Sequence, residues 1–220
     1  EIAQCLVGSE MCIRDSLYTL DCKLTSSVDG QSYAHEKSTT FGMREVEAGE
    51  DHIILNGEPI HLRGTVENAV FPKTGYAPVD DASWERVLRI LKEYGMNHMR
   101  FHSWCPPEAA FNVADRMGFY LQVELPLWTL NVGEDKGTVD FLYAEAAHIM
   151  KEYGNHPSFV LYCNGNEITG NFDFIEELTH YGRVSDKRRL FSGSTARTRV
   201  KSDQFYITHQ TPKGHMATVS

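Results

Sequence analysis

The sequence predicts an α/β protein with a parallel sheet, preceded by a short antiparallel β segment. A helix, a glycine and a strand follow one another three times, as EYGMNHMRF, RMGFYLQVE and EYGNHPSFVLY. Such alternation is typical of a parallel sheet covered by helices. Before it, in LYTLDCKL, most apolar residues fall on alternate positions, which is the period of a half-buried strand.

The β segment begins at Leu17. Residues 17–24 form the first expected strand, SSVDGQS is a turn cluster, and residues 38–45 can supply a returning strand. After the acidic link EVEAGED, the two apolar runs of HIILNGEPIHLRG are joined by Asn56-Gly57, a strong hairpin signal.

The alternating part follows this hairpin. Residues 83–94 predict a helix with Asp80 or Asp81 as its cap and Gly95 as its stop. Two further helices are expected, from Pro107 towards Met117 and over residues 138–153. The remaining expected strands are residues 97–104, 120–125 and 158–163, with weaker candidates at 190–196 and 204–209. With the hairpin strand as the first, we expect six parallel strands, near residues 60, 99, 122, 160, 192 and 206.

The composition excludes several classes of protein. The 220 residues carry 21 basic and 30 acidic side chains, a formal charge of −9, which argues against a nucleic-acid partner. No run of about 18 apolar residues exists, so we expect no membrane span. The five cysteines show neither a C-x-x-C pair nor a zinc-ligand spacing, and they predict no metal site and no disulfide framework. Cellular location and oligomeric state are left open.

Residues 1–16 do not fit the rest of the chain. They lack a basic stretch followed by a sustained apolar run, so they do not form a signal peptide. The string CLVGSEMCIRDS resembles a recurrent read-end artefact of translated environmental sequence. We therefore treat residues 1–16 as a non-native or artefactual segment and exclude residues 5–16 from fold reasoning.

Polar and aromatic residues follow the expected strands, at the sheet edge where α/β folds gather their chemistry. They suit a sugar-binding rim, with aromatic faces for the ring and polar groups for the hydroxyls. These residues are Glu67, Arg100, His102, Trp104, Glu124, Trp128, Asn166 and Glu167.

A phosphate site is the competing interpretation of the same edge. Gly165 and Gly170 have the G-x-x-x-x-G spacing, but Asn171 and Phe172 stand where a P-loop needs Lys and then Ser or Thr. The phosphate interpretation therefore fails. Glu167 carries most of the information, because an ionisable residue that ends an apolar strand is rarely packing. Its alternative roles are to cap the following helix or to pair with an arginine.

Four segments resemble glycoside hydrolase family 2. HPSFVLYCNGNE is similar to the acid/base signature of that family, and NGEPIHLRG to its entry into the barrel. NHMRFHSWCPPEAAFNVADRMGFYLQVELP resembles its second-to-third-strand block, and FGMREVEA the exit from its immunoglobulin-like domain. The resemblance covers about residues 17–210.

The resemblance implies a partial (β/α)8 TIM barrel preceded by the end of an immunoglobulin-like β-sandwich domain. It divides the chain into residues 1–16, residues 17–48 as the C-terminal part of the sandwich, and residues 49–220 as the N-terminal part of the catalytic barrel. The implied activity is the retaining hydrolysis of a terminal β-linked sugar, and the implied partner is a carbohydrate substrate.

Residue roles follow from the resemblance position by position. Glu167 corresponds to the general acid/base, and Asn166 to the neighbour that hydrogen-bonds the sugar 2-hydroxyl. Arg100, His102 and Glu124 correspond to pocket residues. Separately, Trp128 is a candidate sugar platform, and a core or rim aromatic is the equally weighted alternative. A retaining enzyme needs a protonated carboxyl and a second carboxylate about 5–5.5 Å away as nucleophile.

The sequence departs from the family in two ways. Some relatives place a Glu and a His after the third strand as magnesium ligands, but here the stretch is LPLWTLNVG, so we expect no metal and no cofactor. The nucleophile belongs at the seventh strand, whereas we count six. We therefore expect a fragment that lacks its nucleophile and is itself inactive.

Alternatives remain within and outside this interpretation. The favoured activity is β-galactosidase-like, because that is the commonest assignment in the family, and β-glucuronidase or β-mannosidase comes next. A non-catalytic carbohydrate-binding protein and an unrelated complete α/β domain that binds a small ligand are rivals from other classes.

Overall fold

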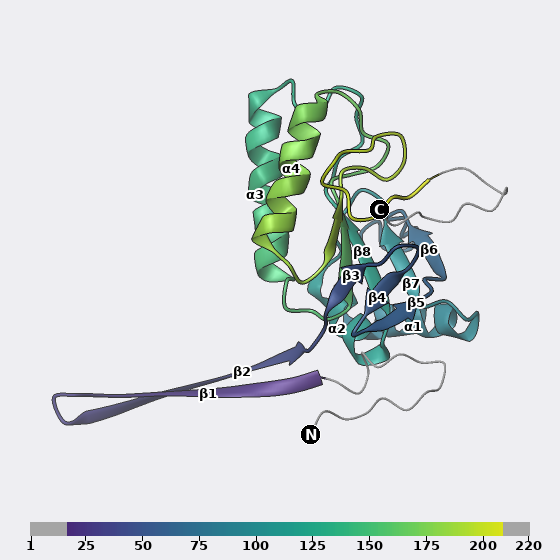
Figure 1. Ribbon diagram of the computed structural model, residues 1–220. Helices are drawn as coiled ribbons and strands as arrows, with labels where there is room; N and C mark the ends of the chain where they lie inside the picture. Colours follow the sequence, from purple (N-terminus) through teal and green to yellow (C-terminus); the bar gives the residue numbers. More distant parts are fainter. Residues whose placement is uncertain (1–16, 209–220) are drawn as a thin grey trace.

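A computed structural model describes residues 17–208 of the chain (Figure 1). The chain starts with a long hairpin of β1 (Leu17–Val28) and β2 (Gln31–Gly42), which projects away from the rest of the molecule. Asp29 and Gly30 join the strands with φ of 51° and 80°, as a two-residue type I′ turn requires. The strands therefore run further into the expected turn cluster than predicted.

A small antiparallel sheet follows, in the order β3 (Val46–Ala48), β4 (Ile53–Leu55) and β5 (Glu58–Ile60). The hairpin predicted at Asn56-Gly57 is confirmed. The assignment of the strand near residue 60 to the parallel sheet was wrong, because β5 pairs only with β4.

The first parallel strand is β6 (Gly64–Glu67) instead. It pairs with β7 (His98–Phe101) from Gly64 opposite His98, and a Cβ at Gly64 would lie 2.6 Å from the His98 ring. The absence of a side chain at Gly64 thus allows the two strands to approach closely.

The predicted parallel α/β sheet is confirmed, and its strands are neighbours in chain order. After β6 they are β7 (His98–Phe101), β8 (Tyr120–Glu124), β9 (Phe159–Cys163) and β10 (Leu190–Ser192). The helices between them are α1 (Asp81–Glu93), α2 (Glu108–Met117), α3 (Lys136–Glu152) and α4 (Phe172–Ser185). Sequential parallel strands with helices outside form part of a barrel wall (Figure 1). In the described part of the sixth expected strand, residues 204–208, Ile207 forms a parallel bridge to Thr195, and the Gln204 N–H donates to the Phe191 carbonyl at 2.9 Å. Residue 209 lies outside the described residues.

Helix ends explain which helices the sequence predicts. The Asp80 side chain accepts a hydrogen bond from the Ser83 backbone N–H at 2.9 Å and caps α1, and Gly118 ends α2 with φ of 63°. Helix α4 was expected only as the helix after Glu167, without bounds. It ends at Asp186 without a glycine, although Asn171 caps its start by accepting from the Phe174 N–H at 3.1 Å.

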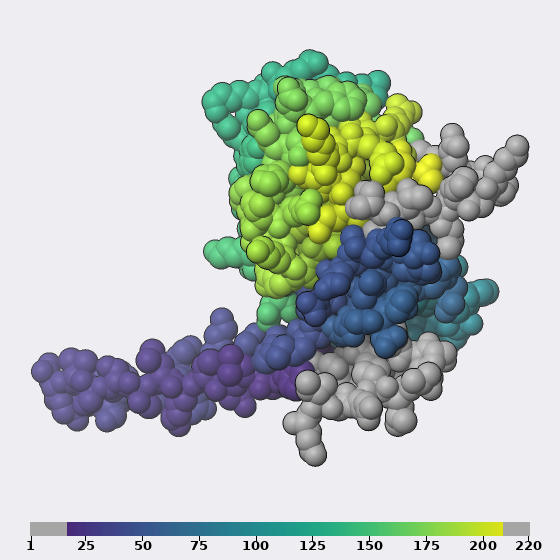
Figure 2. All heavy atoms as spheres, viewed as in Figure 1, coloured from purple at the N-terminus to yellow at the C-terminus, as the bar shows by residue number. Residues whose placement is uncertain are grey.

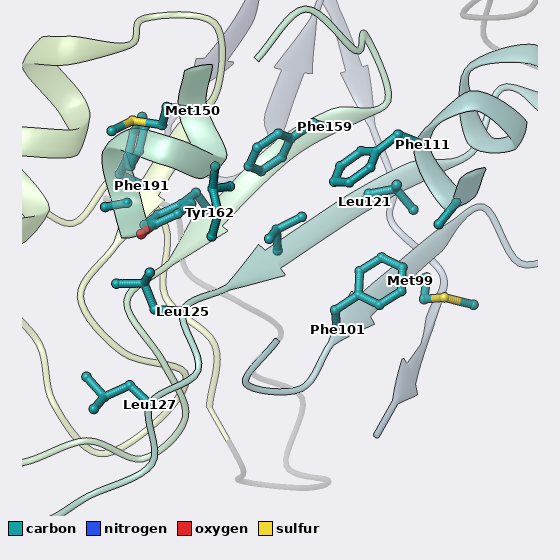
Figure 3. Packing of buried hydrophobic residues seen from close by; sticks show 14 of the residues in the cluster. Met99, Phe101, Phe111, Leu121, Leu125, Leu127, Met150, Phe159, Tyr162 and Phe191 are labelled. Atoms are coloured by element: carbon teal, nitrogen blue, oxygen red, sulfur yellow. The ribbon is translucent and has the colours of Figure 1, made fainter. Parts of the chain in front are cut away.

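Two cores lie on the two faces of the parallel sheet. Between sheet and helices, side chains such as Phe101, Leu121 and Phe159 form the larger core (Figure 3). On the inner face, Tyr120, Val160, Leu161 and Leu190 pack against Val46, Leu55 and Ile60 of the small antiparallel sheet.

These inner residues lie near the amino ends of their strands, so the small sheet closes that end of the wall. Figure 2 shows the residues of the small sheet, in blue, lying against the green and yellow part of the chain. No helix among residues 17–208 is long and apolar enough to cross a membrane.

Candidate active site

The opposite, carboxyl end of the inner face is polar. Side chains alternate between the faces of a strand, so Gln122 and Glu124 of β8 point inward while Leu121 and Val123 join the outer core. Arg100 of the neighbouring β7 has the same inward orientation, between Met99 and Phe101 of the outer core. The fold thus places charged groups at the strand ends, where the sequence predicts the site.

Glu124 lies at the centre of this polar group and is fully buried, with 0% of its surface exposed. The Arg100 guanidinium donates to both of its oxygens, Nε to Oε1 at 2.6 Å and Nη2 to Oε2 at 3.0 Å. Oε1 also accepts from Gln122 Nε2 at 2.9 Å and from the Thr195 hydroxyl at 2.6 Å. Oε2 accepts from the Ser103 backbone N–H at 2.9 Å. Five protein donors therefore occupy this carboxylate.

Arg100 links this buried pair to β9. Its Nη2 also donates to Asn166 Oδ1 at 2.8 Å, and the Asn166 backbone N–H donates to the Leu127 carbonyl at 2.9 Å. Asn166 is buried, with 2% of its surface exposed. The predicted residues Arg100, Glu124 and Asn166 are thus one hydrogen-bonded unit.

Glu167 follows Asn166 in the left-handed region, with φ of 49°. Its backbone N–H donates to the Thr195 carbonyl at 2.8 Å, and its Oε2 lies 3.3 Å from Arg197 Nη2. The side chain of Glu167 is 18% exposed. Pairing with an arginine, one alternative considered from the sequence, is therefore present. Capping of the following helix is contradicted, because Asn171 is the N-cap of α4.

Trp128 and His102 lie together at the rim. Their rings pack edge to face, with centroids 5.6 Å apart and planes at 86°. Trp128 is 65% exposed, so it is a rim aromatic rather than a core one. An exposed indole fixed by a neighbouring ring offers a face to a sugar.

Glu67 connects two strand ends. Its carbonyl accepts from the His102 backbone N–H at 2.9 Å and from Trp104 Nε1 at 3.2 Å, and its carboxylate accepts from the Ala69 N–H at 2.9 Å. Burial raises the pKa of Glu67 above its usual value, although the backbone amides of residues 68–70 oppose the shift. Glu67 therefore organises the loop after β6.

Sequence reasoning missed Gln122, Thr195 and Arg197. Gln122 and Glu124 are two polar residues at alternate positions of an otherwise apolar strand, a signal that both face the same side. No comparable local pattern marks Thr195, whose role depends on contacts with β8 and β9. Among residues 17–208, no group of three or more His, Cys, Asp or Glu side chains is placed to hold a metal ion.

Comparisons with known proteins agree with this geometry. A putative beta-glucuronidase of Formosa agariphila is 30% identical over 177 residues, covering 76% of this chain and 16% of that protein. A beta-galactosidase of Leuconostoc mesenteroides is 25% identical over 145 residues, covering 63% and 14%. The chain thus spans about a sixth or less of the length of these two relatives.

A solved structure shares the fold. The beta-glucuronidase of Parabacteroides merdae superposes with a TM-score of 0.67 at 24% identity, covering 82% of this chain and 23% of that one. The model of the TIM barrel domain of glycosyl hydrolases family 2 matches residues 46–218, most of the chain. This chain therefore belongs to glycosyl hydrolase family 2 and carries part of its TIM-barrel domain.

Proposed function

We propose that the protein is a retaining exo-β-glycosidase that removes terminal β-linked sugars, with Glu167 as general acid/base. The observation that carries this proposal is the pair at the end of β9. The Glu167 carboxyl is partly exposed at the rim, and the adjacent Asn166 is held by Arg100 at 2.8 Å. An ionisable group exposed beside a fixed amide suits proton transfer next to a bound hydroxyl.

The proposed reaction is a double displacement. Glu167 donates its proton to the leaving glycosidic oxygen while a second carboxylate attacks the anomeric carbon and forms the glycosyl-enzyme. Glu167, now ionised, removes a proton from the water that cleaves this intermediate, and both carboxyl groups return to their starting states. Asn166 hydrogen-bonds the sugar 2-hydroxyl, and Trp128 and His102 flank the sugar at the rim. We assign the nucleophile to a strand outside residues 17–208.

The favoured substrate is a β-galactoside. Two arginines at these strand ends, Arg100 and Arg197, are paired with the carboxylates of Glu124 and Glu167. Arg100 therefore offers no free charge to a glucuronide carboxylate, which supports a neutral sugar; Arg197 has a counter-charge only while Glu167 is ionised. A β-glucuronidase is the second candidate, because relatives and structural neighbours carry that name.

The β1–β2 hairpin fits the same proposal. Apolar side chains such as Tyr18, Leu20 and Leu24 are exposed along it, and an isolated two-stranded hairpin is only marginally stable in water. We assign it to the edge of an immunoglobulin-like domain, whose remaining strands would cover these side chains.

Replacing the acid tests the function directly. In the full-length protein, Glu167→Gln is expected to lower kcat on a β-galactoside with a poor alkyl leaving group by about 10²–10⁴-fold. On a dinitrophenyl β-galactoside, whose leaving group needs no proton, the loss in the glycosylation step is expected to stay below about tenfold. The control is Glu177→Gln on the exposed face of α4, which should leave both rates unchanged.

The outcomes separate the alternatives. Equal losses on both leaving groups would contradict the acid/base role. Hydrolysis by the unmodified protein of a β-glucuronide or β-mannoside in preference to the β-galactoside would change the sugar but keep the mechanism. Binding of galactose without any hydrolysis would identify a non-catalytic carbohydrate-binding protein.

A further inference from the structure

Thr195 joins three strands of the site, although it lies beyond the last residue of β10. Its hydroxyl donates to Glu124 Oε1 at 2.6 Å and accepts from Gln122 Nε2 at 3.3 Å, both on β8. Its backbone binds the end of β9, because its carbonyl accepts from the Glu167 N–H and its N–H donates to the Gly165 carbonyl, each at 2.8 Å. Thr195 is buried, with 1% of its surface exposed.

Glu124, the residue that Thr195 contacts, has no acceptor site left for a substrate. A carboxylate offers about four lone-pair positions. The five donors to Glu124 all come from the protein, and the side chain has no exposed surface. Glu124 therefore acts on the reaction through Arg100, which it binds at both oxygens.

Arg100 in turn decides how the Asn166 amide faces. Its Nη2 occupies Oδ1 of Asn166, and a guanidinium can only donate. The amide oxygen must therefore face Arg100, and the NH2 group is the one that turns away from it. A hydroxyl oxygen at C2 of the sugar would then accept a hydrogen bond from Asn166.

We propose that Thr195 is a positioning residue of the reaction, whose hydroxyl acts through Glu124 and Arg100 to fix the Asn166 amide as a donor to the sugar 2-hydroxyl. This inference rests on the proposed function. The route is short, because each member contacts the next within 3.0 Å. A change at the hydroxyl displaces the carboxylate, then the guanidinium, and then the amide.

The side chain can be changed without removing the backbone hydrogen bonds that hold Glu167. Thr195→Val keeps the shape but puts a methyl group where the hydroxyl lies 2.6 Å from Glu124 Oε1, which is too close for a carbon, so the carboxylate must move. Thr195→Ala removes the hydroxyl without that crowding. Thr195→Ser keeps the hydroxyl and is the matched control.

The experiment compares an aryl β-glycoside with its 2-deoxy counterpart in the full-length protein. Thr195→Val and Thr195→Ala are expected to lower kcat/KM on the 2-hydroxy substrate by about 10- to 100-fold, and on the 2-deoxy substrate by less than about threefold. Thr195→Ser is expected to stay within about threefold of the unmodified protein on both. Added to Asn166→Ala, Thr195→Ala should cause little further loss, because both act on the same hydrogen bond.

Other results would overturn the inference. Equal losses on the two substrates would show that Thr195 only supports the fold, and an unchanged rate on both would show that it is not coupled to the site. Failure of Thr195→Ser to restore the rate would exclude the hydroxyl as the active group. If the unmodified protein hydrolysed no glycoside at all, the proposed function itself would be wrong, and this inference would fall with it.

Discussion

Removing the charge of Glu124 tests whether burial makes the Arg100–Glu124 pair contribute strongly to the stability of the barrel. Glu124→Gln keeps the shape but replaces one carboxylate oxygen with an NH2 group. If the amide nitrogen takes the place of Oε2, it faces Arg100 Nη2 and the Ser103 N–H; in the place of Oε1, it faces Arg100 Nε and Gln122 Nε2. Either orientation sets donor against donor and leaves a buried guanidinium without its counter-charge.

An exposed pair supplies the matched control. Arg89 and Glu93 on α1 have their N and O atoms 2.7 Å apart, against 2.6 Å for Arg100 and Glu124, so the contact distance hardly differs. Burial does differ, because the Glu93 side chain is 59% exposed and the Glu124 side chain 0%. Removing one partner of a buried pair costs about 3–5 kcal/mol, whereas an exposed i,i+4 pair contributes about 0.3–0.5 kcal/mol.

Thermal and urea unfolding of the full-length protein measure the two effects. In a domain of this size, each kcal/mol of lost stability lowers the Tm by about 2–4 °C. Glu124→Gln is therefore expected to lower the Tm of the barrel transition by about 6–20 °C. Glu93→Gln is expected to lower it by less than about 2 °C, and both variants should keep the urea m-value of the unmodified protein. Equal shifts for the two variants would refute the reasoning, because burial would then not decide the energy of the pair.

Two further predictions concern other titratable groups of the barrel. Burial lowers the pKa of His98 from 6.5 to about 4, so the unfolded state binds a proton that the folded state does not between these values. The contribution of neutral His98 to the free energy of unfolding is therefore fully present above about pH 6.5 and is lost as the pH drops towards 4. The loss is about 1–3 kcal/mol, because water reaches part of the residue. His98→Asn should remove this pH dependence of the free energy of unfolding, measured across pH 4–7. Burial also raises the pKa of the Cys105 and Cys163 thiols, that of Cys163 to about 12, whereas Cys22 is exposed. At pH 8 iodoacetamide should modify Cys105 and Cys163 of the full-length protein only after unfolding, as mass spectrometry can establish; rapid modification of native Cys163 would contradict its burial.

Local signals made most of the parallel fold predictable. Helix α1 follows from Asp80 at its cap and an apolar stripe, and α2 from its prolines and from Gly118. The first parallel strand was assigned wrongly because two β-like segments adjoin, and only pairing with β7 distinguishes β6 from β5. Such pairing joins residues 34 positions apart, as Gly64 and His98 do, so no local window contains it.

The site, like the fold, has features that local sequence predicts and features that depend on distant partners. Asn166 and Glu167 end an apolar strand and were found from that pattern, as was Glu124 on β8. The structure adds that Glu124 is saturated by protein donors, which the sequence does not indicate, because Thr195 comes from a segment 71 residues away. A residue type thus predicts where polar chemistry lies, whereas partners decide whether it contacts substrate or positions another group.

The two ends of the barrel wall differ in their energetics: one holds backbone strain and buried charge, and the other an apolar core. Among residues 17–208, seven non-glycine residues have positive φ, and two of them, Asp29 and Asn56, lie in hairpin turns that require it. The other five all follow parallel strands: Ala69, Ser103, Glu167, Ala196 and Arg197. Each such conformation costs about 1–2 kcal/mol, and the same end holds the buried Arg100–Glu124 pair. The amino end, in contrast, is closed by an apolar core against the small antiparallel sheet. The apolar core at the amino end stabilises the fold and thus offsets the backbone strain and buried charge at the carboxyl end. For this reason we place the chemistry of the protein at the carboxyl end.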